Sequence, residues 1–219
     1  MMKYSAAIFD MDGLLLDTEQ VCMTAFKQTC CEMNLPFKQE VYLSMIGRNQ
    51  AGIKPIIKQG YGDMLDYSLF HPRWMQHYHA VVEHQAIPVK HGVIELLNWL
   101  QAQKIPMVVA TSTHKALAQK KLHLAGLSTY FSHITCGDEV TQGKPHPEIY
   151  LLAAQRLQVE PNQCIAFEDS NNGVKAAVAA NMATLQIIDL VEPDTETRAL
   201  GHDIFNTMDD ALTFLQTHQ

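Results

Sequence analysis

Residues 4–13 read YSAAIFDMDG, and this stretch decides how the rest of the chain is interpreted. A short apolar run is typical of a buried parallel strand, and here it ends in Asp10. Asp12 follows two residues later, and Gly13 permits the turn that comes next. The stretch predicts a strand that delivers two carboxylates into one loop. Taken alone, it also fits an acidic strand end solvated in a loop.

Four similar runs follow at residues 106–111, 134–137, 164–169 and 184–189, each apolar with a polar carboxyl end. Helical patterns alternate with them at 93–100, 114–125, 149–157 and 174–180. This alternation predicts an α/β fold, a Rossmann-like parallel sheet with helices on both faces. Ligands of such sheets bind beyond the carboxyl ends of the strands, so one cleft is expected to collect Asp10, Thr111, Glu168 and Asp169.

Residues 18–84 break this rhythm, because they contain helical patterns and no convincing strand. Helical stretches are expected around 38–45, 50–59 and 64–84, punctuated by Pro36, Pro55 and Pro72. The predicted organisation is a discontinuous α/β core of residues 1–17 and 85–219, with an α-helical cap of residues 18–84 inserted after the first strand. The insert holds 6 Lys and Arg against 6 Asp and Glu, so the core carries the whole net charge of −7.

Composition excludes several other classes of protein. With 219 residues and 47% hydrophobic side chains, the chain can build a sizeable globular core. A net charge of −7 argues against nucleic acid and anionic lipid as partners. No apolar run approaches the length of about 20 residues that spans a bilayer. The five cysteines are odd in number and lack a CxxC pair, so they are interpreted as reduced core thiols, and a cytoplasmic location is expected. Oligomeric state is not readable, and a monomer fits.

Three further polar segments stand where a phosphoryl-transfer site needs them. Residues 111–113 (TST) end one predicted strand, where hydroxyls and helix N–H groups can hold an anion. Residues 144–147 (KPHP) present Lys144 on a stiff segment before a helix, and residues 168–173 (EDSNNG) end another strand with adjacent carboxylates. Each segment alone fits a helix cap or a surface turn. Their joint order favours phosphoryl chemistry.

In these four segments the chain resembles the haloacid dehalogenase superfamily of hydrolases, in the branch with a helical cap after the first strand. The resemblance runs from about residue 6 to residue 190. It implies a nucleophile at Asp10, which would form an aspartyl-phosphate, and a general acid and base at Asp12. It also implies Mg²⁺ as cofactor, because a carboxylate attacking a phosphate faces charge repulsion.

The resemblance also assigns ligands to these groups. The metal would be held by the Asp10 side chain, the Asp12 backbone carbonyl and Asp169, with Glu168 binding it directly or through water. The transferring phosphoryl oxygens would be held by three residues: Thr111, Ser112 and Lys144. Lys144 is also expected to pair with Asp10.

Substrate selection is expected to involve the cap. Arg48 follows Gly47, as in relatives where such a segment reaches the substrate, and its planar fork suits a second anionic or hydroxyl-rich group. Glu19, His114 and Lys115 are predicted to face the same gap. A solvated surface position is the alternative for each of these four residues.

The family resemblance leaves the reaction open between two enzymes and one signalling protein. Phosphatases that hydrolyse small phosphomonoesters such as phosphosugars or nucleoside monophosphates are the favoured class. A β-phosphoglucomutase-type reaction is the alternative, although Cys22 stands where that mutase has a histidine. A phospho-acceptor receiver module shares the Asp, Thr, Lys and magnesium, but lacks a helical insert after its first strand.

Overall fold

The computed structural model describes residues 4–46 and 50–218, with side chains at all of these except 50 and 51. The chain divides into two compact units, one made of residues 1–17 and 88–219 and the other of residues 18–87. The second boundary lies three residues beyond the predicted one. Helix α4 ends at Val82, and the chain resumes pairing with the core at Pro88, whose carbonyl accepts a hydrogen bond from the Asp17 N–H at 2.9 Å.

The first unit is built on a six-stranded sheet in the order β3-β2-β1-β4-β5-β6, with every neighbouring pair parallel. The central strands β1, β2 and β4 are buried along their whole length, as apolar runs covered on both faces should be. The fold-class prediction is confirmed. The strands are β1 (Ala6–Phe9), β2 (Met107–Thr111), β3 (His133–Cys136), β4 (Cys164–Glu168), β5 (Ala183–Ile187) and β6 (Asp203–Phe205).

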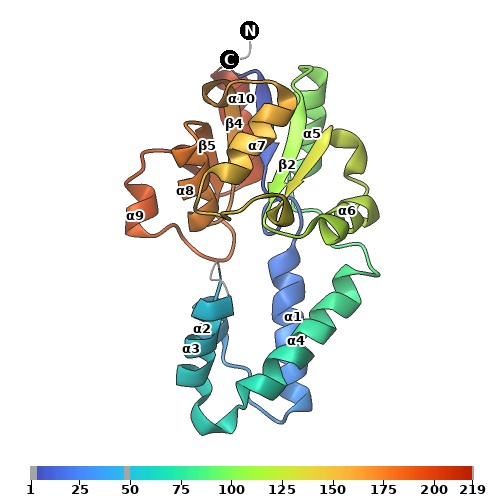
Figure 1. Cartoon of the computed structure of the whole chain (residues 1–219), viewed down its shortest axis with the longest axis vertical. Helices are drawn as coiled ribbons and strands as arrows, with labels where there is room; N and C mark the ends of the chain where they lie inside the picture. Colours follow the sequence, from blue (N-terminus) through green and yellow to red (C-terminus); the bar gives the residue numbers. More distant parts are fainter. Residues whose placement is uncertain (1–3, 47–49, 219) are drawn as a thin grey trace. The chain divides into compact units, whose positions relative to one another are not determined.

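Helices cover both faces of this sheet, with α7 in front of it and α5 and α10 behind it in Figure 1. On the α7 face, a buried apolar cluster joins alternate residues of β1, β2 and β4 to α7 and α8. Phe9 stacks on Phe167 at 4.5 Å between ring centroids, which links β1 to β4. The helices of this unit are α5 (Val93–Ala102), α6 (Lys115–Leu124), α7 (Glu148–Leu157), α8 (Asn171–Ala179), α9 (Thr195–Arg198) and α10 (Met208–Thr217).

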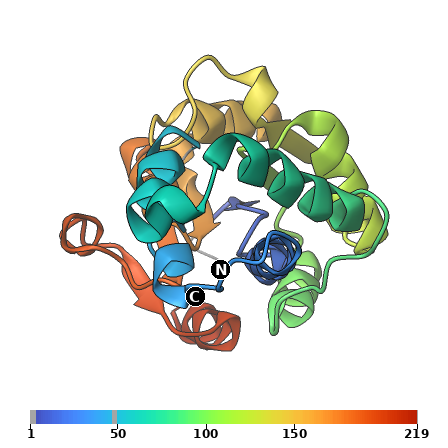
Figure 2. The same cartoon turned by 90° about the horizontal axis from the view of Figure 1, so that it is seen from below.

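Helices and a 3-10 turn are the regular elements of the second unit over its described residues. Phe26 lies at its centre, with the rings of Tyr42, Phe70 and Trp74 at 5.4, 4.9 and 5.0 Å. In Figure 2, α1 is seen nearly end-on while α4 runs across the view, so these two contacting helices are far from parallel. This unit contains α1 (Thr18–Glu32), α2 (Gln39–Leu43), α3 (Gln50–Tyr61), the 3-10 turn η1 (Gly62–Met64) and α4 (Tyr67–Val82).

Pro55 and Pro72 lie inside α3 and α4, within the helical stretches expected there. One expectation about side chains is wrong. The five cysteines form no disulfide, but Cys31 is exposed and Cys22 only half-buried, so these two are not core thiols. Among the described residues no helix has both the length and the apolar character needed to span a bilayer.

Candidate active site

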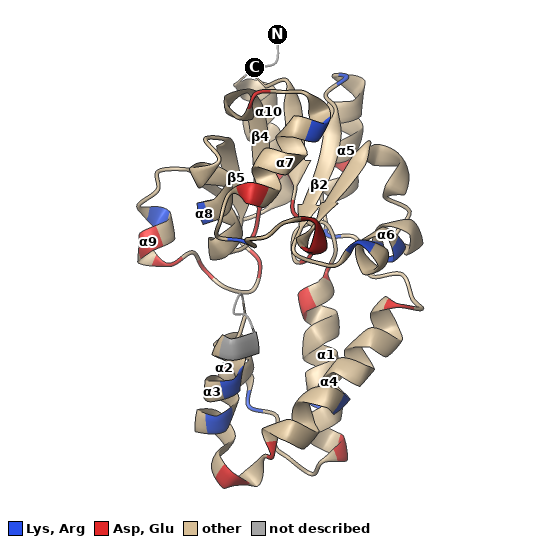
Figure 3. Cartoon of the chain, in the orientation of Figure 1, with Lys and Arg blue, Asp and Glu red and all other residues tan. Residues whose placement is uncertain are grey.

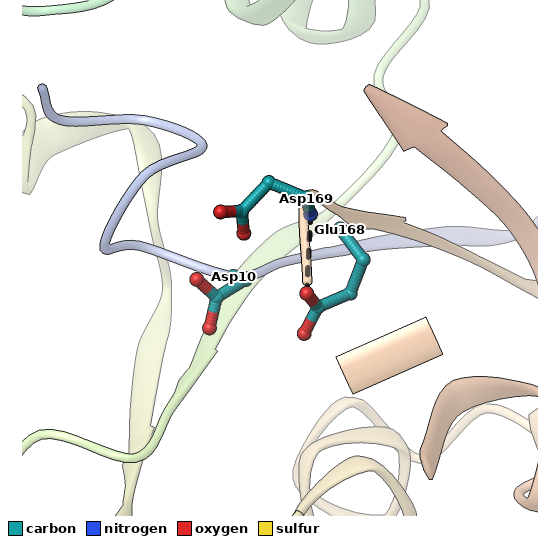
Figure 4. Close-up of side chains that lie close together, drawn as sticks. All are labelled: Asp10, Glu168 and Asp169. Carbon is teal, nitrogen blue, oxygen red and sulfur yellow. Dashed lines mark hydrogen bonds between the residues drawn. The ribbon is translucent and has the colours of Figure 1, made fainter. Parts of the chain in front are cut away.

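Three carboxylates meet where β1 and β4 end side by side in the middle of the sheet. Asp10 directly follows β1, and its backbone N–H still pairs with the Phe167 carbonyl of β4 at 3.0 Å. Glu168 ends β4 and Asp169 follows it; one oxygen of each of the three side chains lies within 4.8 Å of the others (Figure 4). The chain order changes direction between β1 and β4, which is the position where open α/β sheets bind ligands.

Lys144 joins two of these carboxylates. Its Nζ lies 2.5 Å from Asp10 Oδ1, 2.6 Å from Glu168 Oε1 and 3.0 Å from the Ala110 carbonyl oxygen at the end of β2. An ammonium group has three protons to donate, and these three acceptors use them. The predicted pairing of Lys144 with Asp10 is therefore present in the structure, and a phosphoryl oxygen would have to replace one of these acceptors.

Glu168 is fully buried and is held by a network of donors. Its Oε1 also accepts from the Tyr150 hydroxyl at 2.6 Å, and its Oε2 accepts from the backbone N–H groups of Asp169 and Ser170 at 3.1 and 3.2 Å. A Cβ on Gly173 would lie 1.8 Å from a Glu168 oxygen, so α8 can approach only because this position is glycine. The adjacent carboxylates of Glu168 and Asp169 thus have different surroundings (Figure 4).

Burial governs the protonation of this cluster. It raises the pKa of the Asp10 carboxyl to about 7, while the Lys144 ammonium opposes the shift. Burial lowers the pKa of Lys144, but Asp10 and Glu168 raise it by more, so the ammonium stays charged. Burial also raises the pKa of Tyr150 well above its usual value. The ionised form of the Asp10 carboxyl therefore depends on positive charge beside it.

Asp12 lies in the loop after β1 and has its own set of partners. Its Oδ1 accepts from Lys121 Nζ at 2.7 Å, and its Oδ2 accepts from Thr113 Oγ1 at 2.6 Å and Thr111 Oγ1 at 3.4 Å. The loop turns at Gly13, which has φ +87°, and a Cβ there would come within 2.3 Å of Asp169 Oδ2. Glycine is thus required twice, for its backbone conformation and for its close approach to Asp169.

The remaining predicted core residues lie along the loop and helix that follow β2. Ser112 and His114 are exposed, and His114 Nδ1 lies 3.8 Å from an Asp138 oxygen. Lys115 Nζ pairs with Glu139 at 3.1 Å, and Arg156 binds the same carboxylate through two nitrogens. The expected substrate contacts of His114 and Lys115 stay predictions.

The helical unit holds the other two predicted substrate residues. Glu19 lies in the first turn of α1, and its backbone carbonyl accepts from the Tyr42 hydroxyl at 3.2 Å. Arg48 lies outside the described residues. Substrate contact by both residues stays a prediction.

Two buried residues of the site were missed from the sequence: Lys121 and Tyr150. Lys121 lies on the buried face of α6, between Ala118 and Leu122, where the helical pattern calls for an apolar residue. A lysine at such a position indicates a buried polar partner, since lysine is almost never fully buried without one. Tyr150 gives no such signal, because a tyrosine in an apolar helix face is common.

The carboxylate cluster also fits a divalent cation. Asp10, Glu168 and Asp169 offer oxygen atoms, the donors that Mg²⁺ prefers, and the Lys144 ammonium binds the first two of these carboxylates. The donor set therefore suits a hard divalent cation.

Known proteins share this arrangement over most of the chain. The sequence profile of the haloacid dehalogenase-like hydrolases matches residues 7–187. A phosphorylated carbohydrates phosphatase of Thermotoga maritima is 33% identical over 177 residues, which cover 81% of this chain and 82% of that protein. Fructose-1-phosphate phosphatase YqaB of Escherichia coli is 29% identical over 186 residues, 84% of this chain and 97% of its own.

A solved structure agrees with these sequence matches. The HAD family hydrolase of Deinococcus radiodurans R1, which has phosphate and sodium bound, gives a TM-score of 0.83 at 25% identity and covers 99% of this chain and 98% of its own. The matched profile spans the carboxylates after β1 and β4, the hydroxyls after β2 and Lys144. On this match, which extends over most of both units, the chain belongs to the haloacid dehalogenase-like hydrolase family.

Proposed function

We propose that the protein is a Mg²⁺-dependent phosphatase that hydrolyses small phosphomonoesters through an aspartyl-phosphate on Asp10. One observation carries the proposal: Asp10 and Asp12 lie two residues apart but have separate lysine partners, Lys144 and Lys121. Two carboxylates in different surroundings can take different roles in one reaction.

Asp10 is the proposed nucleophile. Its carboxylate oxygen forms a bond to phosphorus while the bond from phosphorus to the ester oxygen breaks. Lys144 lies against Asp10 Oδ1 and Glu168, where its charge favours the ionised carboxylate and neutralises charge on the phosphoryl oxygens. Glu168 holds Lys144 from the buried side, and the Tyr150 hydroxyl in turn donates to Glu168.

Asp12 is the proposed acid and base. It gives a proton to the departing alkoxide and then takes one from the water that cleaves the aspartyl-phosphate, work typically worth about 10²- to 10⁴-fold in rate. The Asp12 side chain is 26% exposed, compared with 10% for Asp10, so it is the more accessible of the two to a leaving group and to water.

Asp10 and Asp169 would hold Mg²⁺ through their side chains and Asp12 through its backbone carbonyl. Glu168 would support the metal indirectly, because its oxygens already accept five hydrogen bonds, from Lys144, Tyr150, Asp169 and twice from Ser170. The cation would supply positive charge that offsets the repulsion between a carboxylate and a phosphate dianion.

The proposed substrates are phosphosugars or nucleoside monophosphates. The relatives named above act on phosphorylated carbohydrates and on fructose 1-phosphate, which supports a sugar phosphate. Thr111 and Ser112 are the proposed phosphoryl contacts beside Lys144. Glu19 and Arg48 of the helical unit remain the proposed residues for the rest of the substrate, with His114 and Lys115 on the core side.

The test is phosphate release from p-nitrophenyl phosphate and from a panel of phosphosugars and nucleoside monophosphates. Activity should require Mg²⁺, disappear with chelator and be abolished in Asp10→Asn. Asp203→Asn is the matched control, because Asp203 is exposed on edge strand β6, two strands away from β4. Full activity of Asp10→Asn, or activity that survives chelation, would contradict the mechanism.

The same panel separates the two alternatives. Exchange between glucose 1-phosphate and glucose 6-phosphate without loss of phosphate would indicate a mutase. A long-lived phosphorylated Asp10 with no phosphate released would indicate a phospho-acceptor module. Phosphate release with turnover supports the phosphatase over both.

A further inference from the structure

We propose that Lys121 is a positioning residue that fixes the Asp12 carboxylate in the orientation from which it exchanges protons with the leaving group and with water. The proposal deepens the proposed function and rests on it. Lys121 lies near the end of α6, 109 residues along the chain from Asp12, and outside the four segments that identify the family. Figure 3 shows Lys and Arg positions, in blue, on α6.

The geometry constrains both oxygens of Asp12. Lys121 Nζ donates to Oδ1 at 2.7 Å, and Thr113 Oγ1 donates to Oδ2 at 2.6 Å. Two short bonds to opposite oxygens fix the rotation of a carboxylate, which one bond alone does not. Thr113 follows β2 and Lys121 lies on α6, so two elements fix the orientation of a side chain that the loop after β1 presents.

Burial of Lys121 indicates a purpose beyond stability. Its side chain is 1% exposed and takes a place on α6 between buried Ala118 and Leu122. Removing an ammonium from water costs several kcal/mol, and an apolar side chain of similar size is often as stable or more stable at such a position. A buried lysine that meets a carboxylate of the site is therefore better explained by the orientation that it imposes on Asp12.

The pair also has a buried end and an accessible end. Asp12 is 26% exposed while Lys121 is almost fully covered, so the lysine holds the carboxylate from the protein side and leaves part of it open to solvent. Within the described residues, the Lys144 ammonium binds Asp10, Glu168 and the Ala110 carbonyl, whereas Asp12 binds Lys121. Each of the two carboxylates thus has a separate anchor.

This role predicts a dependence on the leaving group. Poor leaving groups need a proton as they depart, whereas good ones leave as anions, so a misplaced acid slows the poor ones selectively. The experiment measures kcat/KM of wild type and Lys121→Met for 2,4-dinitrophenyl, p-nitrophenyl and phenyl phosphate. We expect a loss of about tenfold or more on phenyl phosphate and of less than about threefold on dinitrophenyl phosphate, within the range attributed to acid catalysis.

A double-mutant cycle tests whether Lys121 acts through Asp12. In an Asp12→Ala background, Lys121→Met should change phenyl phosphate hydrolysis by less than about threefold, because the group that it positions is absent. Lys120→Met is the matched control, since Lys120 is the exposed neighbour on α6 and should leave all three substrates unchanged. Circular dichroism of each variant serves as the control for folding.

Thr113→Val provides a second variant should Lys121→Met not fold, since it releases the other oxygen of Asp12. It should also slow phenyl phosphate more than dinitrophenyl phosphate. Equal losses of kcat/KM on all three esters would overturn the positioning role. So would a loss in the Asp12→Ala background as large as the loss in wild type. Either result would leave the proposed function standing. A wild-type protein that releases phosphate from none of the esters overturns the proposed function and this role together.

Discussion

The hydroxyl of Tyr150 provides the sharpest test of how the site is built. It is fully buried on α7 and donates to Glu168 Oε1 at 2.6 Å, beside the Lys144 ammonium that shares the same oxygen. Tyr150→Phe removes this one donor and keeps the ring, which lies 5.1 Å from Lys144 Nζ. The substitution therefore isolates a single hydrogen bond to a buried carboxylate.

The expected loss of folding stability depends on the hydrogen bonds that Glu168 keeps in the variant. A hydrogen bond to a charged group contributes about 1.5–3 kcal/mol to stability. Glu168 keeps four other hydrogen bonds, from Lys144, the Asp169 N–H and two groups of Ser170, so it is not left unsatisfied. We expect the lower half of that range, about 1.5–2 kcal/mol, which for a chain of this size lowers the melting temperature by about 3–8 °C.

Urea unfolding and thermal melting of the full chain measure this change. Tyr130→Phe is the matched control, because the Tyr130 hydroxyl makes an exposed, neutral bond to Asn98 at 2.9 Å and should contribute at most about 0.5 kcal/mol. Burial keeps the pKa of Tyr150 well above its usual value, so the hydroxyl remains a donor and the loss should not depend on pH near neutrality.

The Tyr150→Phe substitution should change phosphatase activity only slightly. Lys144 keeps its bonds to Asp10, Glu168 and the Ala110 carbonyl in the variant, so we expect kcat to stay within about threefold of wild type, a change of roughly 0.65 kcal/mol. A Tyr150→Phe protein no less stable than Tyr130→Phe would refute the reasoning, since the buried bond would then add nothing to the fold.

Three other predictions concern the glycine loop, an ion pair and the metal. Gly13→Ala should weaken Mg²⁺ binding at least tenfold in calorimetric titration, because the Cβ would meet Asp169 Oδ2 at 2.3 Å on a backbone at φ +87°; unchanged affinity would mean that the loop yields. Arg156 hydrogen bonds lower the pKa of Glu139 to about 2, so Glu139→Gln should lower the melting temperature above about pH 4.5, and the difference should shrink as the pH falls toward 2; a constant difference would contradict the pairing. Saturation with Mg²⁺ at about 100 times its Kd should stabilise the folded chain by about 2.7 kcal/mol, and the absence of any shift in melting would argue against the site.

The sheet was predictable because its strands are short apolar runs with polar carboxyl ends. Strand β6 was not predicted, since its three residues are exposed or half-buried and too few to show a period. Helix α10 was also missed, although Thr207 caps it by accepting from the Asp210 N–H at 3.1 Å. Capping boxes are visible in a sequence, but they do not reveal where a helix packs.

The acidic cluster shows where prediction from sequence ends. Glu168 and Asp169 are adjacent letters in one motif, and the sequence offers both as metal ligands. Successive side chains at a strand end point to opposite faces, so one of them is buried against α7 and α8 while the other approaches the Gly13 loop. Which carboxylate is buried is decided by the helices that cover each face.

By itself, the sequence determined which groups stand at the carboxyl edge of the sheet, because strand periodicity places the residue after each apolar run at that edge. The proximity of Lys144 to Asp10 was implied by the family resemblance and not by a local pattern. Only the tertiary structure decided which donors each carboxylate receives. Lys121 and Tyr150 come from α6 and α7, and their contacts with Asp12 and Glu168 depend on how those helices dock against the sheet, a long-range packing result that no local pattern encodes.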